Sequence, residues 1–179
     1  MQYGMEYDSP VGLLTVASDG DNITGLWIAG QRYHCAGVSE PLVPHHNLPI
    51  FDAARHWLDR YFAGESPAIS ELPLAPVGGQ FRQGVWEILK EIPYGEVTTY
   101  GSIATQMAER TGKTKMSARA VGGAVGHNPI SIIIPCHRVI GSGGNLTGYG
   151  GGIAKKIKLL ALEGIDTSHM RIPTKGTAL

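Results

Sequence analysis

Two adjacent side chains of this sequence are suited to nucleophilic chemistry, the thiol of Cys136 and the imidazole of His137. A thiol is a strong nucleophile only as a thiolate, so its pKa, about 8.5 when unperturbed, must be lowered by a nearby positive charge, base or hydrogen-bond donor. His137 and Arg138 are the nearest candidates for that effect. The alternative interpretation is that Cys136 is a small buried residue of the core.

The apolar run before the thiol predicts how Cys136 is presented. Ile132 to Ile134 are three consecutive β-branched residues, which is typical of a strand covered on both faces. Pro135 fixes φ and removes one ladder donor, so we expect this strand to end beside Cys136. Because successive strand residues point to opposite faces, we expect the proton of Cys136 to reach His137 through a water molecule.

The composition sets limits on the class of protein. At 179 residues and 42% hydrophobic content, the chain can hold one large domain or two small ones. The two cysteines, Cys35 and Cys136, are too few for a disulfide framework and favour a reducing compartment. No apolar run approaches the roughly 20 residues that span a bilayer, and the first residues lack the basic start of a signal peptide. We therefore expect a cytoplasmic protein, or a nuclear one in a eukaryote, with no membrane partner.

The formal net charge is zero, but the charges are distributed unevenly. Residues 1–79 hold three basic and nine acidic side chains, whereas residues 80–179 hold twelve basic and six acidic ones. This asymmetry indicates that the second half meets a polyanion, although solvated charges on ordinary helix faces would also produce it.

Turn and helix signals divide the chain into two domains. In residues 11–17 and 22–28, apolar and polar side chains alternate as they do along a β-strand. A Ser-Asp-Gly-Asp turn lies between them, which predicts a hairpin. Residues 52–62 carry apolar side chains at helical spacing and stop at Gly64. Residues 65–79 hold three prolines and have the composition of a linker. We therefore expect domains at residues 1–75 and 76–179.

The second half is predicted to contain a helix-turn-helix. After a helix at residues 81–90, Thr98 or Thr99 can cap a helix that runs to about Ala108. Ser117 can cap a second helix, from Ala118 to about Val125, beyond a basic turn. A purely structural corner of two helices is the alternative.

The second helix of this pair has an unusual face. Opposite its apolar stripe, Arg119 stands beside Gly122 and Gly123, with Gly126 one turn further along. Each glycine inside a helix costs about 1 kcal/mol relative to alanine. Close approach to a phosphate backbone would offset this cost, and close packing against another helix is the structural alternative.

Motifs in both halves of the chain resemble those of a known family, the 6-O-alkylguanine-DNA alkyltransferases. The resemblance runs from about Phe81 to Gly164, and the N-terminal half resembles the RNase H-like domain of the family. The motifs that carry it are Pro135-Cys136-His137-Arg138-Val139, Pro93-Tyr94-Gly95-Glu96-Val97, Tyr100, Ala118-Arg119-Ala120-Val121-Gly122, Asn128-Pro129, Ser9-Pro10-Val11-Gly12 and the helix from Trp57 to Gly64.

The resemblance implies a fold and an activity. The fold is α/β of the α+β type, with an N-terminal RNase H-like sheet-and-helix domain and a mostly helical C-terminal domain that holds a helix-turn-helix and a short active-site strand. The activity is direct repair of double-stranded DNA, in which an alkylated guanine is flipped out and its alkyl group passes irreversibly from the exocyclic oxygen to Cys136. 4-O-alkylthymine is a second expected substrate. The resemblance implies no cofactor and a monomer. Some members of the family bind structural zinc in the N-terminal domain, but the spacing of the histidines and cysteines here leads us to expect no metal.

The resemblance also assigns roles to residues. His137 is the base reached through water, Glu163 orients it, and Asn128 braces the turn before the active-site strand. Arg119 fills the vacancy left by the flipped base, and Tyr100 faces the guanine and helps to rotate the phosphate. The remaining residues implied are Thr99, Ala118, Ala120 and Gly122 on the DNA, and Pro135, Val139, Tyr149 and Gly150 around the base. Relatives often have serine or alanine where this chain has Gly150, which puts one contact to the base in doubt.

Several residues have an interpretation that does not depend on the resemblance. Glu163 lies at the end of a predicted helix, where its negative charge interacts unfavourably with the helix dipole. A partner such as His137 would explain a glutamate at this position, although a solvated glutamate needs no partner.

The segment 141–152 holds seven glycines and is a pocket wall or a flexible connector. Lys155, Lys156 and Lys158 are predicted to form a solvated face that attracts DNA. The spacing of His34, Cys35, His45 and His46 matches no recognised metal pattern.

Two other classes of function remain open. A lesion-binding protein of the alkyltransferase-like branch lacks the acceptor cysteine, so Cys136 argues against it. A cysteine hydrolase would use Cys136 and His137 for turnover. Incubation with labelled alkylated DNA separates the three classes, which predict stoichiometric label on the protein, binding alone, and catalytic release.

Overall fold

The computed structural model describes residues 1–174, and the chain divides into two compact units. The first unit contains Met1–Gly78 together with Pro129–Ile133. The second unit contains Gly79–Asn128 and the chain from Ile134 onward. The units are therefore not two contiguous stretches of sequence, because a short segment from the second half returns to the first unit.

The returning segment is held by the backbone of strand β3 (Ile23–Ile28). Leu26 donates its N–H to Pro129 O at 2.8 Å, and Ser131 donates its N–H to Leu26 O at 2.9 Å. The sequence analysis placed residues 129–133 in the second domain, and the structure corrects this. The pairing was not predictable locally, because it joins residues about 100 positions apart.

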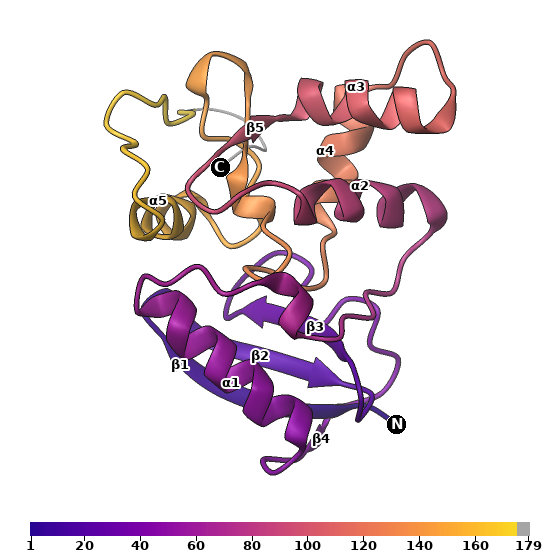
Figure 1. Ribbon diagram of the computed structural model, residues 1–179, viewed down its shortest axis with the longest axis vertical. Helices are drawn as coiled ribbons and strands as arrows, with labels where there is room; N and C mark the ends of the chain where they lie inside the picture. The colour runs from indigo at the N-terminus through magenta and orange to yellow at the C-terminus, as the bar shows by residue number, and fades with distance from the viewer. Residues whose placement is uncertain (175–179) are drawn as a thin grey trace. The chain divides into compact units, whose positions relative to one another are not determined.

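The first unit is built on a four-stranded sheet in the order β3-β2-β1-β4 (Figure 1). The predicted hairpin is confirmed, since β2 and β3 pair antiparallel. Two strands were not predicted, β1, which pairs antiparallel with β2, and the short β4, which pairs parallel with β1. The strand bounds are β1 (Tyr3–Ser9), β2 (Gly12–Ser18), β3 (Ile23–Ile28) and β4 (Val43–Pro44).

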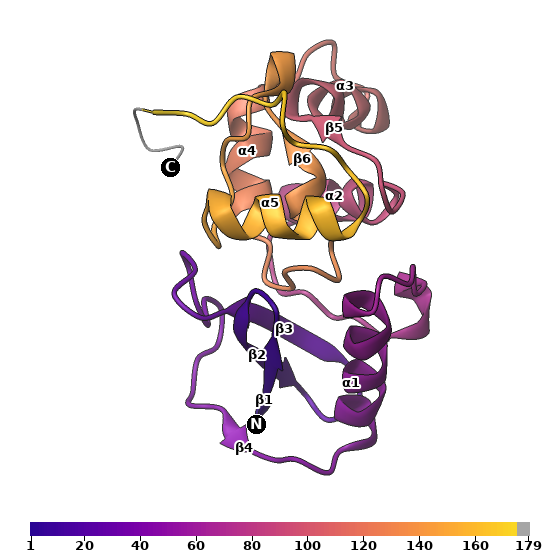
Figure 2. The ribbon, with the colours of Figure 1, turned by 90° about the vertical axis from the view of Figure 1, so that its left-hand side faces the viewer.

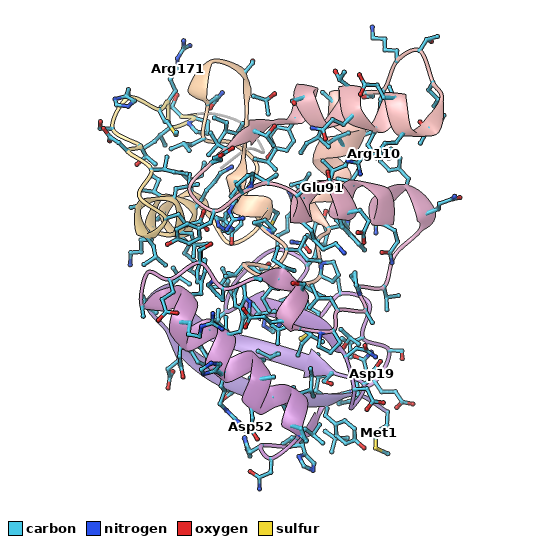
Figure 3. All side chains as sticks on the ribbon, viewed as in Figure 1. Met1, Asp19, Asp52, Glu91, Arg110 and Arg171 are labelled. Atoms are coloured by element: carbon cyan, nitrogen blue, oxygen red, sulfur yellow. The ribbon has the colours of Figure 1, made fainter. Side chains whose placement is uncertain are left out.

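The turn of the hairpin is closed by one carboxylate. Asp19, labelled in Figure 3, accepts hydrogen bonds from the backbone N–H of Asp21 at 3.0 Å and of Asn22 at 2.7 Å. Such a local side-chain acceptor replaces the ladder partners that the reversing backbone loses. The alternation that predicted β2 then directs Leu14 and Val16 into the core, where both are fully buried.

Helix α1 (Pro49–Phe62) covers one face of this sheet (Figures 1 and 2). Its first residue is a proline, whose missing N–H has no helical partner at that position anyway. Phe51 and Leu58 are fully buried on its inner face. The helix ends before Gly64, whose φ of 86° lies in the left-handed region, as the sequence predicted.

The segment predicted as a linker is partly attached to the sheet. It contains a 3₁₀ turn at Ile69–Glu71. Further along, Ile23 donates its N–H to Pro73 O and accepts from Ala75 N–H, both at 2.8 Å. The residues between the turn and the second unit are therefore fixed along β3 as far as Ala75.

The second unit contains four helices and a two-stranded parallel pair among its described residues. Helices α2, α3 and α4 pack against one another, and β5 pairs with β6 (Figure 1). The bounds are α2 (Gln80–Lys90), β5 (Thr98–Thr99), α3 (Tyr100–Thr111), α4 (Ala118–Gly126), β6 (Val139–Ile140) and α5 (Ile153–Leu162).

Two polar contacts tie the first three of these helices together. The indole N–H of Trp86 on α2 donates to Ala124 O on α4 at 2.9 Å, inside the core. At the surface, Arg110 near the end of α3 pairs with Glu91, which follows α2, at 2.6 Å (Figure 3). The buried bond satisfies a donor that would be costly to leave unpaired, whereas the exposed pair contributes little to stability.

The predicted helix-turn-helix is confirmed, including both caps. Thr99 Oγ1 accepts from Ser102 N–H at 3.1 Å at the start of α3, and Ser117 Oγ accepts from Ala120 N–H at 3.2 Å at the start of α4. Helix α3 continues past Ala108 to Thr111, one turn longer than predicted. Each cap satisfies an N–H group that the helix itself cannot pair.

Gly84, a glycine inside α2, has a packing reason. A Cβ at this position would lie 3.1 Å from Cε of Met107 on α3. The glycine therefore lets two helices approach closely, which compensates for its conformational entropy in a helix.

The strand predicted before the thiol is not formed. Ile132 has a φ of 71°, and the chain turns through hydrogen bonds from Ile133 N–H to Ser131 O and from Cys136 N–H to Ile134 O, both at 2.8 Å. Cys136–Arg138 then form a 3₁₀ turn, and a strand, β6, begins only at Val139. The three isoleucines are buried as predicted, but burial rewards apolar side chains whatever the backbone conformation, so the run did not determine a strand.

No helix within residues 1–174 is both long and apolar enough to cross a membrane.

Candidate active site

The second unit contains all the site residues that the sequence predicted. Cys136 is the first residue of the 3₁₀ turn and is buried, with 7% of its surface exposed. Asn128, two residues beyond α4, donates from Nδ2 to Ile134 O at 2.8 Å, inside the protein. The amide thus ties the segment that follows α4 to the backbone just before the thiol, in the position predicted for a brace.

Several groups act on the ionisation of Cys136. Burial raises the pKa of the Cys136 thiol, while a hydrogen bond from Asn128, the charge of Lys156 and backbone N–H groups at Cys136 and His137 oppose it. Burial has the larger effect, so the net pKa lies above its ordinary value rather than below it as the sequence analysis expected. A thiolate here therefore needs a base that removes the proton as reaction proceeds.

A buried carboxylate lies beside the thiol segment and joins three elements. Glu163, the residue that follows α5, accepts from His137 Nε2 at 2.6 Å through Oε1. Arg138 holds both carboxylate oxygens, with Nε at 2.8 Å from Oε2 and Nη2 at 3.0 Å from Oε1. The backbone N–H of Gly95 lies 3.3 Å from Oε2. The predicted partner of Glu163, His137, is therefore in contact with it.

These contacts determine the protonation of the carboxylate and the ring. Burial alone would raise the pKa of Glu163, but the hydrogen bonds and charges of His137 and Arg138 outweigh it and lower the pKa to about 2. An ionised carboxylate only accepts hydrogen bonds, so Nε2 of His137 carries the proton of that contact. Burial, assisted by the charges of Arg138 and Lys156 and opposed by Glu163, lowers the pKa of His137. The ring is therefore neutral at neutral pH, with its lone pair on Nδ1.

Lys156 on α5 is buried, contrary to the prediction of a solvated face. It has no exposed surface, and Nζ donates to Val139 O at 2.5 Å and to Thr147 O at 3.1 Å. Burial lowers the pKa of Lys156 to about 8, and the neighbouring Cys136 acts against that shift. The sequence does hold a signal for this, because Lys156 shares a helix face with the buried Leu159 and Leu160, three and four residues further on.

The other two lysines of that set differ from Lys156. Lys158 is exposed, as predicted, and Lys155 is half-buried. A single helix therefore carries one lysine turned into the protein and one turned to the surface, which makes Lys158 a natural control for changes at Lys156.

The glycine-rich segment that follows β6 is held by hydrogen bonds and is not a free connector. The hydroxyl of Tyr100, at the start of α3, donates to Thr147 O at 3.0 Å. Thr147 O thus accepts from both Tyr100 and Lys156. A Cβ at Gly148 would lie 2.5 Å from the Tyr100 hydroxyl, and Gly148 has a φ of 79°, so only glycine fits there. Burial raises the pKa of Tyr100, which keeps its hydroxyl protonated as a donor.

The predicted pocket residues are mostly buried. Pro135, Val139 and Tyr149 are buried, and Gly150 is half-buried. The Tyr149 hydroxyl is buried with no hydrogen-bond partner among the described residues, and burial raises the pKa of this phenol. An unpaired buried hydroxyl is costly, so it marks a place where a ligand can supply the missing partner.

The predicted DNA-facing side of α4 is open. Ala118, Arg119 and Ala120 are exposed, opposite the buried stripe of the helix. Apart from the chain neighbours and the backbone of the helix itself, no described atom lies within 4 Å of the positions that Cβ atoms would take at Gly123 and Gly126. The packing explanation therefore fails for these two glycines as far as the described chain extends. Gly122 differs, because its Cβ would meet the ring of Tyr100 at 3.8 Å, while Thr99 is half-buried.

The remaining predicted groups are the candidate metal ligands and the second cysteine, Cys35. Among residues 1–174, no three His, Cys, Asp or Glu side chains gather in a way that could hold a metal ion. Cys35, in the first unit, is half-buried, and burial raises the pKa of its thiol.

The residues that sequence patterns did not assign to the site are Lys156, which looked solvated, and Arg138, which was considered only as a cation near the thiol.

Comparisons with known proteins agree along nearly the whole chain. Residues 80–165 match the DNA binding domain, and residues 2–76 the ribonuclease-like domain, of 6-O-methylguanine DNA methyltransferase. The methylated-DNA–protein-cysteine methyltransferase of Haemophilus influenzae is 44% identical over 163 residues, which cover 91% of this chain and 87% of that protein. The protein of the same name from Mycobacterium tuberculosis is 48% identical over 159 residues, covering 87% of this chain and 88% of the relative.

A solved structure shows the same fold. The crystal structure of a Mycobacterium tuberculosis protein in complex with DNA superposes with a TM-score of 0.76 at 44% identity. The match covers 90% of this chain and 92% of that one.

Proposed function

Because the chain belongs to the methylated-DNA–protein-cysteine methyltransferase family, we propose that it repairs DNA by moving the alkyl group of 6-O-alkylguanine onto Cys136. The observation that carries the proposal is the thiol at the end of the helix-turn-helix segment, tied to it through Asn128 and followed directly by the buried His137–Glu163 contact. 4-O-alkylthymine presents the same alkyl-oxygen bond and is a second substrate. The protein acts as a monomer on double-stranded DNA.

The reaction is a single displacement. The Cys136 thiol gives its proton to His137 through a water molecule, and Sγ forms a bond to the alkyl carbon. The bond between that carbon and the exocyclic oxygen breaks, its electron pair stays on the guanine, and the guanine takes up one proton. Overall, the guanine gains the proton that the Cys136 thiol loses and returns to its unmodified form. The thioether formed on Cys136 is permanent. Each molecule therefore acts once and needs no cofactor.

The buried carboxylate supports the role of His137. Since Glu163 accepts from Nε2, it holds the ring in the tautomer whose Nδ1 can receive a proton. Its position at the end of α5 is unfavourable for a carboxylate by a few tenths to about 1 kcal/mol, and the contacts with His137 and Arg138 compensate.

The open face of α4 is the DNA-binding surface in this proposal. Gly123 and Gly126 allow a phosphate backbone to approach the helix closely, and Arg119 enters the stack where the alkylated base has left. Thr99, Tyr100, Ala118 and Ala120 contact the strand nearby. The base then enters a pocket formed by Pro135, Val139, Tyr149 and Gly150. Tyr149 provides both a flat ring for stacking and a hydroxyl in need of a partner.

One labelling experiment tests the proposal. Duplex DNA that carries 6-O-[³H]methylguanine is incubated with the protein, with Cys136→Ala and with Cys35→Ala. We expect one label per molecule on the parent protein and on Cys35→Ala, and none on Cys136→Ala, which still binds the duplex because its helix-turn-helix is intact. Repeated turnover would indicate a hydrolase. Label on Cys35, or labelling of Cys136→Ala, would refute the assignment of the acceptor.

A further inference from the structure

Arg138 makes three hydrogen bonds close to the thiol segment through its guanidinium group. Two of its nitrogens hold both oxygens of Glu163, and Nη1 donates to Ile92 O at 2.7 Å. Its guanidinium lies over the ring of Tyr94, 5.7 Å from the centroid. Only 7% of the residue is exposed. A planar guanidinium fork can make this paired contact, and a lysine ammonium cannot.

The carboxylate of Glu163 is therefore shared by one fixed cation and one titratable ring. If Glu163 faced His137 alone, the buried anion would draw a second proton onto the ring, and the two would form an ion pair. With Arg138 in place, the anion is already neutralised. A proton on His137 would then add a net positive charge to a buried cluster, which is costly in a medium of low polarity.

All the charged groups around His137 fit this charge balance. Glu163 at the end of α5 favours the charged ring, whereas Arg138 in the same 3₁₀ turn and Lys156 on α5 disfavour it, as does burial. The nearby phenols, Tyr94 and Tyr149, have pKa values raised by burial, with the charge of Glu163 acting in the same direction, so they stay uncharged.

We propose that Arg138 is a positioning residue of the transfer reaction: by serving as the fixed counter-charge of Glu163 it keeps His137 neutral and able to accept the Cys136 proton. An imidazolium at this place has no lone pair and cannot accept that proton. Arg138 thus acts through Glu163 and His137, and the inference rests on the function proposed above.

Two substitutions separate the charge of Arg138 from its shape. Arg138→Gln keeps hydrogen-bond donors beside Glu163 and removes the charge, whereas Arg138→Lys keeps the charge and loses the fork. The first measurement is the rate of alkyl transfer from alkylated duplex between about pH 5.5 and 9, where a base that must be neutral causes the rate to fall on the acid side. The second is the titration of the His137 ring by NMR, with label in histidine.

The two variants are expected to differ in their pH profiles. In Arg138→Gln the acid-side fall and the ring titration move up by about one pH unit or more, which lowers the rate about tenfold at pH values below both titrations and leaves pH 9 nearly unaffected. Arg138→Lys keeps the parent profile even if its rate is lower throughout. An equal loss for Arg138→Gln at every pH, with an unchanged ring titration, would show that Arg138 only supports the fold.

A double variant covers the possibility that Arg138→Gln does not fold. Arg138→Met combined with Glu163→Gln removes both buried charges and leaves neither unpaired. Its ring titration should lie at or below that of the parent, and a titration above the parent would overturn the proposal. If the parent protein accepts no label from DNA, the proposed function fails, but the NMR titrations still decide whether Arg138 sets the protonation of His137.

Discussion

Because Lys156 is buried, the free energy of unfolding should rise with pH in the alkaline range, and Lys156→Met should remove that rise. The pKa of Lys156 falls to about 8 because the side chain is fully buried, whereas an unfolded lysine titrates near 10.5. The unfolded state therefore binds more protons than the folded state between these values, and the free energy of unfolding rises with pH in that window.

The size of the effect follows from the two pKa values. The charged lysine costs the folded state about 3.3 kcal/mol at pH 7 and about 0.8 kcal/mol at pH 10, so stability should rise by about 2.5 kcal/mol between them. Methionine has a similar length and no charge, so the variant should lack this rise. Its absolute stability is a weaker test, because it also leaves Val139 O and Thr147 O without the Lys156 donor.

The assay is urea unfolding at pH 7, 8, 9 and 10. All proteins carry Cys136→Ala, because burial raises the pKa of the Cys136 thiol on folding, which adds its own pH dependence, and its charge acts on Lys156. Lys158→Met is the matched control, since it removes an exposed lysine from the same helix and should keep the full rise. If Lys156→Met shows the same rise as the parent and the control, the buried ammonium is not its source and the reasoning is wrong.

Two further predictions concern the DNA interface and the loop. Arg119→Ala should transfer from alkylated duplex at least tenfold more slowly yet react almost normally with free 6-O-benzylguanine, because only a stacked base has an unstacking cost of a few kcal/mol. Arg82→Ala, which removes an exposed arginine of α2, is the charge control. Equal losses on both substrates would exclude the finger role. Gly148→Ala should destabilise the protein by about 1–3 kcal/mol in thermal unfolding, since its φ of 79° and the Tyr100 hydroxyl leave no room for a methyl group; an unchanged melting curve would contradict this.

The elements that the sequence predicted well are those decided by neighbouring residues. Helix caps at Thr99 and Ser117, the amphipathic spacing of α1 and the Asp19 turn depend on groups within a few positions along the chain. The same holds for the helix-turn-helix, because two capped amphipathic helices with a short turn leave few other arrangements. Residue types and their spacing were therefore enough to indicate these elements, whereas the fold of the two domains and the family were implied by the resemblance of the motifs.

The errors all lie where distant parts of the chain meet. The apolar run at residues 132–134 is buried, but no strand of the described chain is placed to pair with it, and Ile132 turns the backbone instead. Strand β1 and the short strand β4 likewise exist only through their partners in the sheet. A strand is completed by hydrogen bonds to another segment, so residue types alone do not determine it.

The chemistry of the site shows the same division. The sequence by itself determined which groups are present: a thiol beside an imidazole, a carboxylate at a helix end, and a helix that carries glycines and an arginine on one face. Only the tertiary structure decided their charge states, because burial sets them: it raises the pKa of Cys136, turns Lys156 inward to two carbonyl groups, and gives Glu163 a second partner in Arg138. The energy of a charge depends on the polarity and the partners around it, and those are contributed by residues far apart in the chain.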